Sequence, residues 1–331
     1  MKKNLLGITI AILFASCITA QRKTLGSIER IDPEINSIIR SNATIEIIGE
    51  GFEWTEGPLW VEKYRMLLFS DVPKNTIYKW TEQKGTEVYL NPSGYTGPVA
   101  RGGETGSNGL KLTTDGRLLL CQHGNRQVAV MNAPLDAPKP VFVSIANNYK
   151  GKKFNSPNDA VIRSNGDIFF TDPPYGLEKG MEDSTKELPF QGVYKVGKDG
   201  KVTLLTDSIT RPNGIGLTTD EKTLIVANSD GNKLVWYAFD LSPGDSLTNG
   251  RIFRDASAES KSEKGGPDGF KITRQGYMFA TAPGGIWVFN KGGKVIGKIK
   301  IPEATSNCVL SDDEKTLYVT ADMYVLRVKL Q

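Results

Sequence analysis

Six oxygen-bearing residues recur along the chain, and each opens a similar unit of sequence. They comprise one glutamate, one aspartate and four asparagines, namely Glu56, Asn108, Asn158, Asn213, Asp268 and Asn307. Carboxylate and amide oxygens are the ligands that a hard divalent cation binds in proteins. Asparagine and aspartate also occur in ordinary turns and strand caps, so a single member of this set would indicate only a turn. Six members at matching phase favour a metal site.

The spacing of these six anchor residues predicts the fold that brings them together. Consecutive anchors lie 52, 50, 55, 55 and 39 residues apart. Each is followed by an apolar stretch, a turn such as Asp-Gly, Asn-Gly or Asp-Glu-Lys, and a dense hydrophobic strand, which together indicate hairpins. Four short strands in about 50 residues are typical of one propeller blade. We therefore expect an all-β, six-bladed β-propeller of four-stranded antiparallel blades, with the anchors around a central metal-bearing channel.

The segments outside the repeat suggest how the ring is completed. Thr44–Ile48 has strand character and precedes the first unit, so we expect it to pair with the last blade and close the ring. The best helix candidate is Pro33–Arg40. Three turn-rich stretches read as insertions between blade elements: Tyr95–Gly106, Pro173–Gln191 and Ser257–Gly266. Such long connections are often functional.

The N-terminus has the pattern of a removable leader over residues 1–20, followed by one domain over residues 21–331. Lys2 and Lys3 precede an apolar run that is too short to span a bilayer. We favour signal cleavage before Gln21. Alternatively, Cys17 ends a lipoprotein box and becomes a lipidated N-terminus. Either route predicts export to the periplasm or the extracellular space, with membrane attachment only if Cys17 is lipidated.

Composition excludes several classes of function. The chain carries 41 basic and 37 acidic residues, for a net charge of +4, without a basic stripe. A nucleic-acid partner is therefore not expected. His123 is the only histidine, which excludes a histidine-rich zinc site. The two cysteines outside the leader, Cys121 and Cys308, lie in apolar strand-like surroundings and are expected to be buried thiols.

Several motifs resemble the gluconolactonase/regucalcin (senescence-marker-protein) family. EGPLW, SPND, RPNGIG and GGPDG occur in this order, and RGGETGSNGL, LLLCQHGNRQV and FFTDPPYG resemble its bacterial gluconolactonase branch. The resemblance runs from about Gly51 to about Ala321. It implies a six-bladed propeller with one catalytic divalent metal, whose ligands by motif are Glu56, Asn158, Asn213 and Asp268. It also suggests a second set of residues that face the substrate or its cleft, namely Asn108, Arg101, Glu104, Tyr175 and His123.

The family resemblance implies a metal-dependent hydrolase that opens a sugar lactone, a carboxylic ester hydrolase of the gluconolactonase type. The metal would activate the carbonyl as a Lewis acid for attack by water. Asp268 is the candidate for metal ligand and general base, and His123 for a hydrogen-bond partner or proton shuttle. The alternatives are a phosphotriesterase-like or other hydrolase or lyase chemistry on the same platform, and a non-catalytic propeller that binds a glycan or protein.

The oxygen ligands and the family resemblance also predict the cofactor and the partners. Oxygen-only ligation favours Ca²⁺, with Zn²⁺, Mn²⁺ and Mg²⁺ as alternatives. The expected partner is a small-molecule sugar lactone, and the chain is expected to be a monomer or a small homo-oligomer.

Overall fold

The computed structural model describes residues 22–331, and the predicted leader lies outside these residues. The described chain is nearly all β and contains six blades, each with four antiparallel strands in order from the axis outward. Blade 1 contains β3 (Thr55–Val61), β4 (Met66–Asp71), β5 (Thr76–Thr81) and β6 (Gly85–Leu90). Blade 2 contains β7 (Ser107–Leu112), β8 (Leu118–Gln122), β9 (Gln127–Met131) and β10 (Phe142–Ala146). Blade 3 contains β13 (Ala160–Ile162), β14 (Ile168–Asp172), β15 (Gly192–Val196) and β16 (Val202–Thr206).

The second half of the chain repeats this pattern. Blade 4 contains β17 (Pro212–Leu217), β18 (Thr223–Asp230), β19 (Lys233–Leu241) and β20 (Leu247–Asp255). Blade 5 contains β21 (Phe270–Ile272), β22 (Met278–Ala282), β23 (Gly285–Phe289) and β24 (Val295–Lys300), with β1 (Ser27–Arg30) as a fifth, outer strand. Blade 6 contains β25 (Thr305–Leu310), β26 (Thr316–Ala321), β27 (Tyr324–Lys329) and, from the other end of the chain, β2 (Ile45–Glu50).

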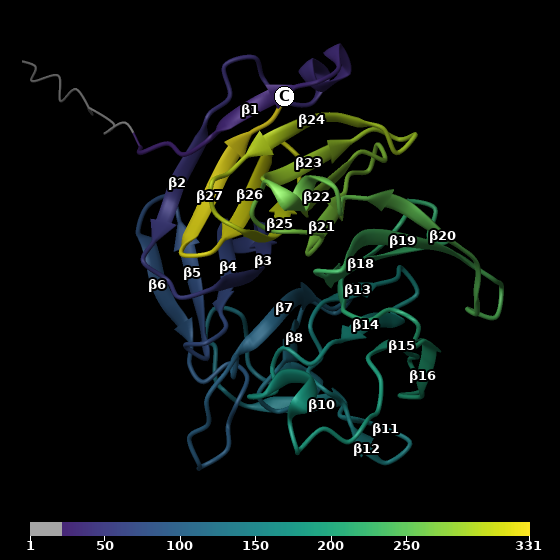
Figure 1. Ribbon diagram of the computed structural model, residues 1–331. Coiled ribbons are helices and arrows are strands. Elements are labelled where there is room, and N and C mark those ends of the chain that lie inside the picture. The colour runs from purple at the N-terminus through teal and green to yellow at the C-terminus, as the bar shows by residue number, and fades with distance from the viewer. Residues whose placement is uncertain (1–21) are drawn as a thin grey trace, which may run out of the picture.

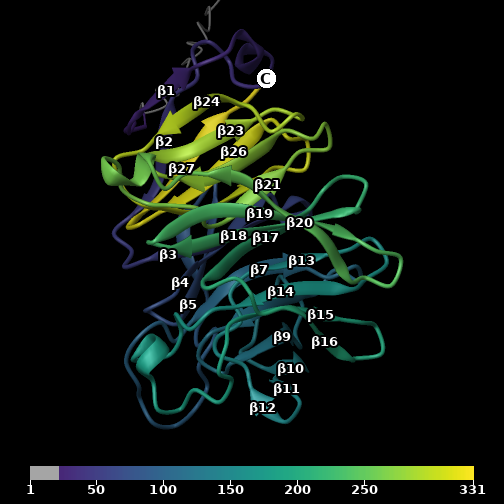
Figure 2. The same ribbon diagram turned by 45° about the vertical axis from the view of Figure 1, so that its right-hand side comes forward.

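The blades form a closed ring, which Figures 1 and 2 show from two sides. The first strand of each blade contacts the first strand of the next, in the cycle β3, β7, β13, β17, β21, β25 and back to β3. These six inner strands therefore surround the axis, and the later strands of each blade lie progressively further out. The prediction of a six-bladed propeller is confirmed.

The ring is closed by the N-terminal strand, as the sequence predicts. Strand β2 pairs antiparallel with β27, with Ile45 opposite Val328 and Glu50 opposite Tyr324. In Figure 1 the purple β2 lies beside the yellow β27. An isolated bridge between Ile39 and Leu330 adds a second link between the two ends of the described chain. Blade 6 is thus built from both ends, and the ring cannot open without breaking this sheet.

The layers between blades supply the hydrophobic core. Large aromatic side chains that are fully buried fill them, among them Phe170, Tyr194, Trp236 and Trp287. The two predicted buried thiols, Cys121 and Cys308, belong to these layers and are not bridged to each other. Strand alternation places one face of each blade against its neighbour on either side, so every blade contributes to two layers.

The connections hold the remaining short elements. The predicted helix over Pro33–Arg40 is a shorter 3-10 helix, η1 (Pro33–Ser37), which begins where the Asp32 side chain accepts a hydrogen bond from the Glu34 amide. The other short elements are η2 (Glu62–Tyr64), η3 (Gly180–Glu182), η4 (Glu259–Lys261) and the hairpin β11 (Asn148–Tyr149) and β12 (Lys152–Lys153). Among the described residues, helices are too short to cross a membrane.

Candidate functional site

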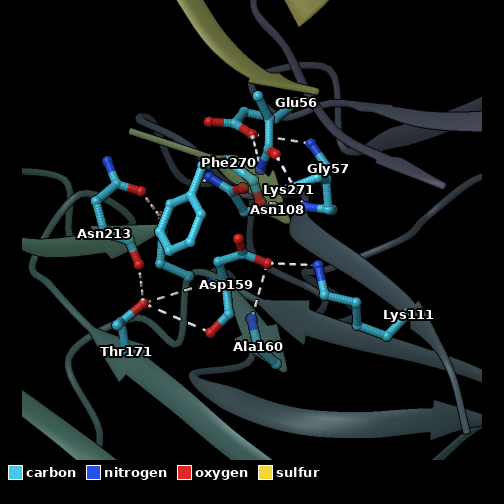
Figure 3. Close-up of polar contacts among 12 residues, drawn as sticks. Glu56, Gly57, Asn108, Lys111, Asp159, Ala160, Thr171, Asn213, Phe270 and Lys271 are labelled. Atoms are coloured by element: carbon cyan, nitrogen blue, oxygen red, sulfur yellow. Dashed lines mark hydrogen bonds and ion pairs between the residues drawn. The ribbon is translucent and has the colours of Figure 1, made fainter. Parts of the chain in front are cut away.

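All six anchors lie where the chain enters the inner strand of a blade. Four are within the first residues of β3, β7, β17 and β25, and two stand two residues before β13 and β21. Their side chains are buried, with exposures between 1 and 4 %, except that of Asp268, which is partly exposed. The anchors thus form one ring of carboxylates and amides around the axis, and Figure 3 shows Glu56, Asn108 and Asn213 on different sides of its centre.

A local irregularity of the strands turns the anchors toward the axis. The pairing of the first two strands shifts register at the anchor in four blades, for example between Glu56 and Leu59 in blade 1 and between Pro212 and Ile215 in blade 4. The same shift occurs in blades 2 and 6. A bulge at this point interrupts the alternation of the strand and redirects a side chain.

Glycine follows the anchor where neighbouring inner strands approach most closely. Gly57 has a φ of +52°, and a Cβ atom there would lie 1.9 Å from the carbonyl oxygen of Asn108. A Cβ on Gly214 would lie 2.1 Å from the carbonyl oxygen of Asp268. Adjacent blades therefore meet backbone to backbone at the axis, which narrows the ring enough for anchors of different blades to touch.

A chain of hydrogen bonds joins anchors of successive blades. The Asn108 amide donates to Asn158 Oδ1 at 3.0 Å, and the Asn158 amide donates to Asn213 Oδ1 at 2.5 Å. The Asn213 amide in turn donates to Ser229 Oγ at 3.0 Å. On the other side of the ring, the Asn307 amide lies 3.4 Å from Glu56 Oε2. These contacts fix the amide orientations relative to one another.

The two carboxyl groups of the ring lie in a setting that disfavours their charge. Burial raises the pKa of Glu56 to about 8, and the carboxylates of Asp159 and Glu104 act in the same direction. Burial, followed by the charge of Glu56, raises the pKa of Asp268 well above its ordinary value. Two carboxylates in a desolvated ring repel each other, and a bound cation would offset this repulsion.

The donor set fits a divalent cation. Asn108 Oδ1 and Asp268 Oδ1 are buried oxygens without a hydrogen-bond partner in residues 22–331. Free carboxylate and amide oxygens at the centre of a ring are the donors that a hard cation takes. No cluster of three or more His, Cys, Asp or Glu side chains suited to a metal occurs in the same residues. Amide oxygens would therefore have to complete the ligand shell beside Glu56 and Asp268.

His123 lies behind the ring, where it contacts Asn158. The imidazole is fully buried, and its Nε2 lies 3.0 Å from Asn158 Oδ1. Its Nδ1 lies 3.1 Å from Glu104 Oε2. The structure thus brings both predicted residues together with an anchor, in the order Glu104, His123, Asn158. The buried ring nitrogen is directed at a protein oxygen, which suits holding Asn158 in position.

Arg101 joins two of the predicted insertions. Its guanidinium donates to the carbonyl oxygen of Gly176 at 3.1 Å and lies over the ring of Tyr95, 5.2 Å from its centroid. It also lies 3.4 Å from the carbonyl oxygen of His123. Burial lowers the pKa of the Arg101 guanidinium. These contacts link the loop before β7 to the loop after β14 beside the imidazole.

Tyr175 lies on the same side of the ring as Asp268. Burial, followed by the charge of Asp268, raises the pKa of the Tyr175 hydroxyl. Asp172 at the end of β14 is fully buried. Its carboxylate accepts hydrogen bonds from the backbone amides of Asn155 and Ser156 at 2.8 and 2.7 Å. Asp172 therefore holds the segment that leads to the anchor Asn158 by its backbone.

Three charged residues near the axis were not predicted from the sequence. Lys111 on β7 forms an ion pair of 2.8 Å with Asp159, whose side chain is 1 % exposed. Lys271 on β21 donates to the carbonyl oxygen of Phe270 at 3.0 Å and lies 3.4 Å from Asn307 Oδ1. Figure 3 shows Asp159 and Lys271 beside the anchors. A signal existed in the repeat: Asp159 follows its anchor at a position where four other units have glycine.

Curated proteins similar to this chain carry lactonase names. A gluconolactonase of Zymomonas mobilis is 37 % identical over 312 residues, which cover 92 % of this chain and 86 % of that protein. A lactonase named drp35 of Staphylococcus saprophyticus is 27 % identical over 270 residues, or 78 % of this chain and 72 % of that protein.

Solved structures agree with the fold over nearly the whole chain. A gluconolactonase from Xanthomonas campestris superposes with a TM-score of 0.79 at 26 % identity and covers 95 % of this chain and 99 % of its own. A calcium-binding protein, regucalcin, from Agrobacterium tumefaciens has a TM-score of 0.66 at 16 % identity, with coverages of 86 and 93 %, and supports the fold alone. The family described as SMP-30/Gluconolactonase/LRE-like region matches residues 54–322. The chain therefore belongs to the SMP-30/gluconolactonase family.

Proposed function

We propose that this protein is a cation-dependent hydrolase that opens a sugar lactone of the aldonolactone type. The observation that carries the proposal is the meeting of the Glu56 and Asp268 carboxyl groups, with unpartnered Asn108 and Asp268 oxygens, at the axis of the ring. The 37 % identity to a gluconolactonase over most of both chains supports the substrate class. Ca²⁺ is the proposed ion, because every donor in the ring is oxygen.

Four anchors are proposed to hold the cation, namely Glu56, Asn158, Asn213 and Asp268. The Asn158 and Asn213 amide oxygens accept hydrogen bonds from neighbouring anchors, so a bound cation would replace part of these contacts. When bound there, a divalent cation supplies Lewis-acid polarisation of the lactone carbonyl. His123 and Glu104 hold Asn158 from behind, since the imidazole Nε2 lies 3.0 Å from its oxygen. This positioning role for His123 takes the place of the proton shuttle considered from the sequence, because the imidazole is fully buried.

Asp268 is the proposed general base. Its Oδ1 has no hydrogen-bond partner within residues 22–331, so this oxygen is available to accept a proton from water. The water oxygen would bond to the carbonyl carbon, the ring C–O bond would break, and the proton would pass to the departing ring oxygen. The product is the open hydroxy acid. Tyr175, on which the charge of Asp268 acts, and the anchor Asn108 are proposed to contact the sugar hydroxyls.

The Arg101 contacts suggest a role at the edge of the site. Its guanidinium joins the loop before β7 to the loop after β14 through the Gly176 carbonyl. We assign Arg101 to shaping the substrate cleft by holding these two loops together. Export from the cell, through the leader predicted for residues 1–20, completes the proposal.

The test is hydrolysis of D-glucono-1,5-lactone, followed as proton release, by purified protein before and after chelation. This lactone also opens spontaneously, so the Glu56→Gln variant serves as the blank. We expect turnover that chelation removes and that Ca²⁺ restores. Paraoxon is offered in parallel as a phosphotriester probe. Turnover of paraoxon without lactone turnover would replace the lactonase assignment, and activity in neither assay would favour a binding propeller.

The role of Asp268 has its own test. Asp268→Asn keeps the size of the side chain and an oxygen that can bind a cation, but it removes the base. We expect kcat to fall by at least about 100-fold while a cation still binds. An Asp268→Asn variant that retains most of its kcat would exclude this residue as the base.

A further inference from the structure

Three charged residues lie near the anchors, one or three positions after an anchor in the sequence. At the same positions the other blades have uncharged residues. The residue after the anchor is glycine in four units, at Gly57, Gly109, Gly214 and Gly269, whereas blade 3 has Asp159. The residue three positions after the anchor is apolar or glycine in four units and lysine in two, at Lys111 and Lys271. The propeller fold therefore does not require charge at these positions.

These three residues, the channel triad Lys111, Asp159 and Lys271, come from three different inner strands or their entrances. Asp159 Oδ1 accepts hydrogen bonds from Lys111 Nζ and from the Ala160 amide, both at 2.8 Å. The side chains of Lys111 and Asp159 are 17 and 1 % exposed. Burial opposes the charge of Asp159, yet the ammonium groups of Lys111 and Lys271 hold its pKa below the ordinary value. Figure 3 shows Lys111 paired with Asp159, and Lys271 closer to Asn108.

The channel triad is connected to the anchors by a short path. Lys271 Nζ lies 3.4 Å from Asn307 Oδ1, and the Asn307 amide lies 3.4 Å from Glu56 Oε2. Asp159 directly follows the anchor Asn158, and its Oδ2 has no hydrogen-bond partner in the described part of the chain. The triad is thus close to the ring, and water screens it little because it is buried.

We propose that the channel triad sets how tightly the axial ring holds its divalent cation. Below the pKa of Lys271, which burial lowers to about 8, two ammonium groups and one carboxylate give the triad a net charge of +1. The ring above it carries two carboxylates once a cation has displaced the protons of Glu56 and Asp268. The sum of −1 attracts a divalent cation less strongly than the bare ring would. Taking a positive charge from the triad tightens cation binding, and taking its negative charge weakens it. The inference rests on the proposed cation site and deepens it.

The experiment is calorimetric titration of chelator-treated protein with Ca²⁺, without substrate. Lys271→Met keeps the length of the side chain and removes its charge, and we expect the Kd for Ca²⁺ to fall by at least about tenfold. Asp159→Asn keeps an oxygen for the Ala160 amide, and we expect the Kd to rise by at least about tenfold. The double variant restores a triad charge of +1, and its Kd should return to within about threefold of the wild-type value.

A matched control lies far from the axis. Lys195 and Asp245 form an ion pair of 2.7 Å between blades 3 and 4, with side chains 18 and 17 % exposed. Lys195→Met and Asp245→Asn change the total charge of the protein by the same amounts but should leave the Kd for Ca²⁺ within about twofold. If Asp159→Asn fails to fold, Lys111→Met provides a second tightening variant, and a Kd that does not fall in both lysine variants relative to Lys195→Met then overturns the inference. Thermal melts report folding in each case.

The outcomes separate this inference from the proposed function. Opposite shifts in Kd with recovery in the double variant support the channel triad, whether or not the protein opens a lactone. Shifts of the same sign, or shifts no larger than those of the Lys195 and Asp245 controls, overturn the inference while leaving the cation site in place. A wild-type protein that binds no divalent cation overturns both the cation site and the inference.

Discussion

Between the blades, side chains of the propeller are apolar and fully buried, as Phe170, Trp236 and Trp287 are, whereas at the axis the inner strands present Glu56 and Asp268. The layers pack mainly apolar atoms, and their unpartnered polar atoms, such as the Trp236 Nε1 and the Tyr194 hydroxyl, are uncharged groups of large aromatic side chains. The axis instead carries two carboxyl groups with raised pKa values, and the charge of Glu56 acts on Asp268. This difference indicates that the layers between blades account for stability and that the axis is kept for a ligand, at a cost to the free protein.

The largest expected effect comes from opening the ring. Deletion of residues 41–50 removes β2, the fourth strand of blade 6, and we expect the cooperative thermal transition to be lost. Ile45→Ala is the milder version, because Ile45 is 2 % exposed in the layer between blades 5 and 6. We expect it to lower the free energy of unfolding by about 2–5 kcal/mol. Circular dichroism melts test both, and an unchanged melting temperature in the deletion would contradict closure by β2.

The next effect separates activity from stability. Glu56→Gln removes a buried charge at the axis but keeps the shape of the side chain. We expect kcat for D-glucono-1,5-lactone to fall by at least about 100-fold. The cation-free variant should melt at or above the wild-type temperature, because the desolvation that raises the pKa of Glu56 is relieved. A large loss of stability in this variant would contradict the division between axis and layers.

A smaller effect tests the close approach of inner strands. Gly57→Ala would place its Cβ 1.9 Å from the Asn108 carbonyl oxygen, so we expect a loss of about 2–4 kcal/mol in the free energy of unfolding. Gly116→Ala is the control, since Gly116 also has a positive φ, of +79°, but a Cβ there meets nothing within 4 Å. The control should lose only about 1 kcal/mol. Urea titration measures the free energy of unfolding of both variants. Equal losses would show that the close contact between the Gly57 and Asn108 backbones has no special role.

The smallest effect concerns pH. A cation must displace protons from Glu56 and Asp268, whose pKa values are raised in the free ring. Cation affinity should therefore strengthen as pH rises from 6 toward the Glu56 pKa of about 8, with proton release on binding. The stability of the chelated protein should instead fall as pH rises over the same range. An acid whose pKa is raised by folding stabilises the fold below its ordinary pKa, and this stabilisation is lost as pH rises through the folded value.

Titration calorimetry in buffers of different ionisation enthalpy measures the released protons. Thermal melts of the chelated protein at each pH measure how its melting temperature changes with pH. Glu56→Gln should make this change with pH smaller. Cation affinity that is independent of pH would contradict the raised pKa values at the axis.

The fold could be predicted from the sequence because the repeat is carried by local patterns. Hairpin turns, dense apolar strands and one polar anchor recur in every unit, and Thr44–Ile48 has strand character without a partner nearby. The phase of the repeat also predicted that Glu56 and Asp268 lie in one ring, where the charge of Glu56 acts on Asp268. Their role as metal ligands, which the family motifs suggest, stays a prediction. In contrast, the length of the helix after Pro33 depends on the Asp32 cap and on packing, and neither is visible in the local pattern.

The surroundings of the anchors could be predicted only in part. The Glu104–His123–Asn158 contact joins a loop, a strand end and an anchor that are far apart in the sequence. The pairing of Lys111 with Asp159 likewise crosses blades, so no local spacing reports it. Only the substitution of aspartate for glycine after Asn158 hinted at a special charge.

The central claim is that one cation at the axis is needed for lactone opening, and it is tested most directly by restoring that cation. Chelator-treated protein is titrated with Ca²⁺ while D-glucono-1,5-lactone hydrolysis and bound Ca²⁺ are measured in the same samples. The account predicts that turnover returns in proportion to bound Ca²⁺ and saturates at one ion per chain, and that Glu56→Gln shows no recovery. Full turnover in protein that holds no divalent cation would contradict it.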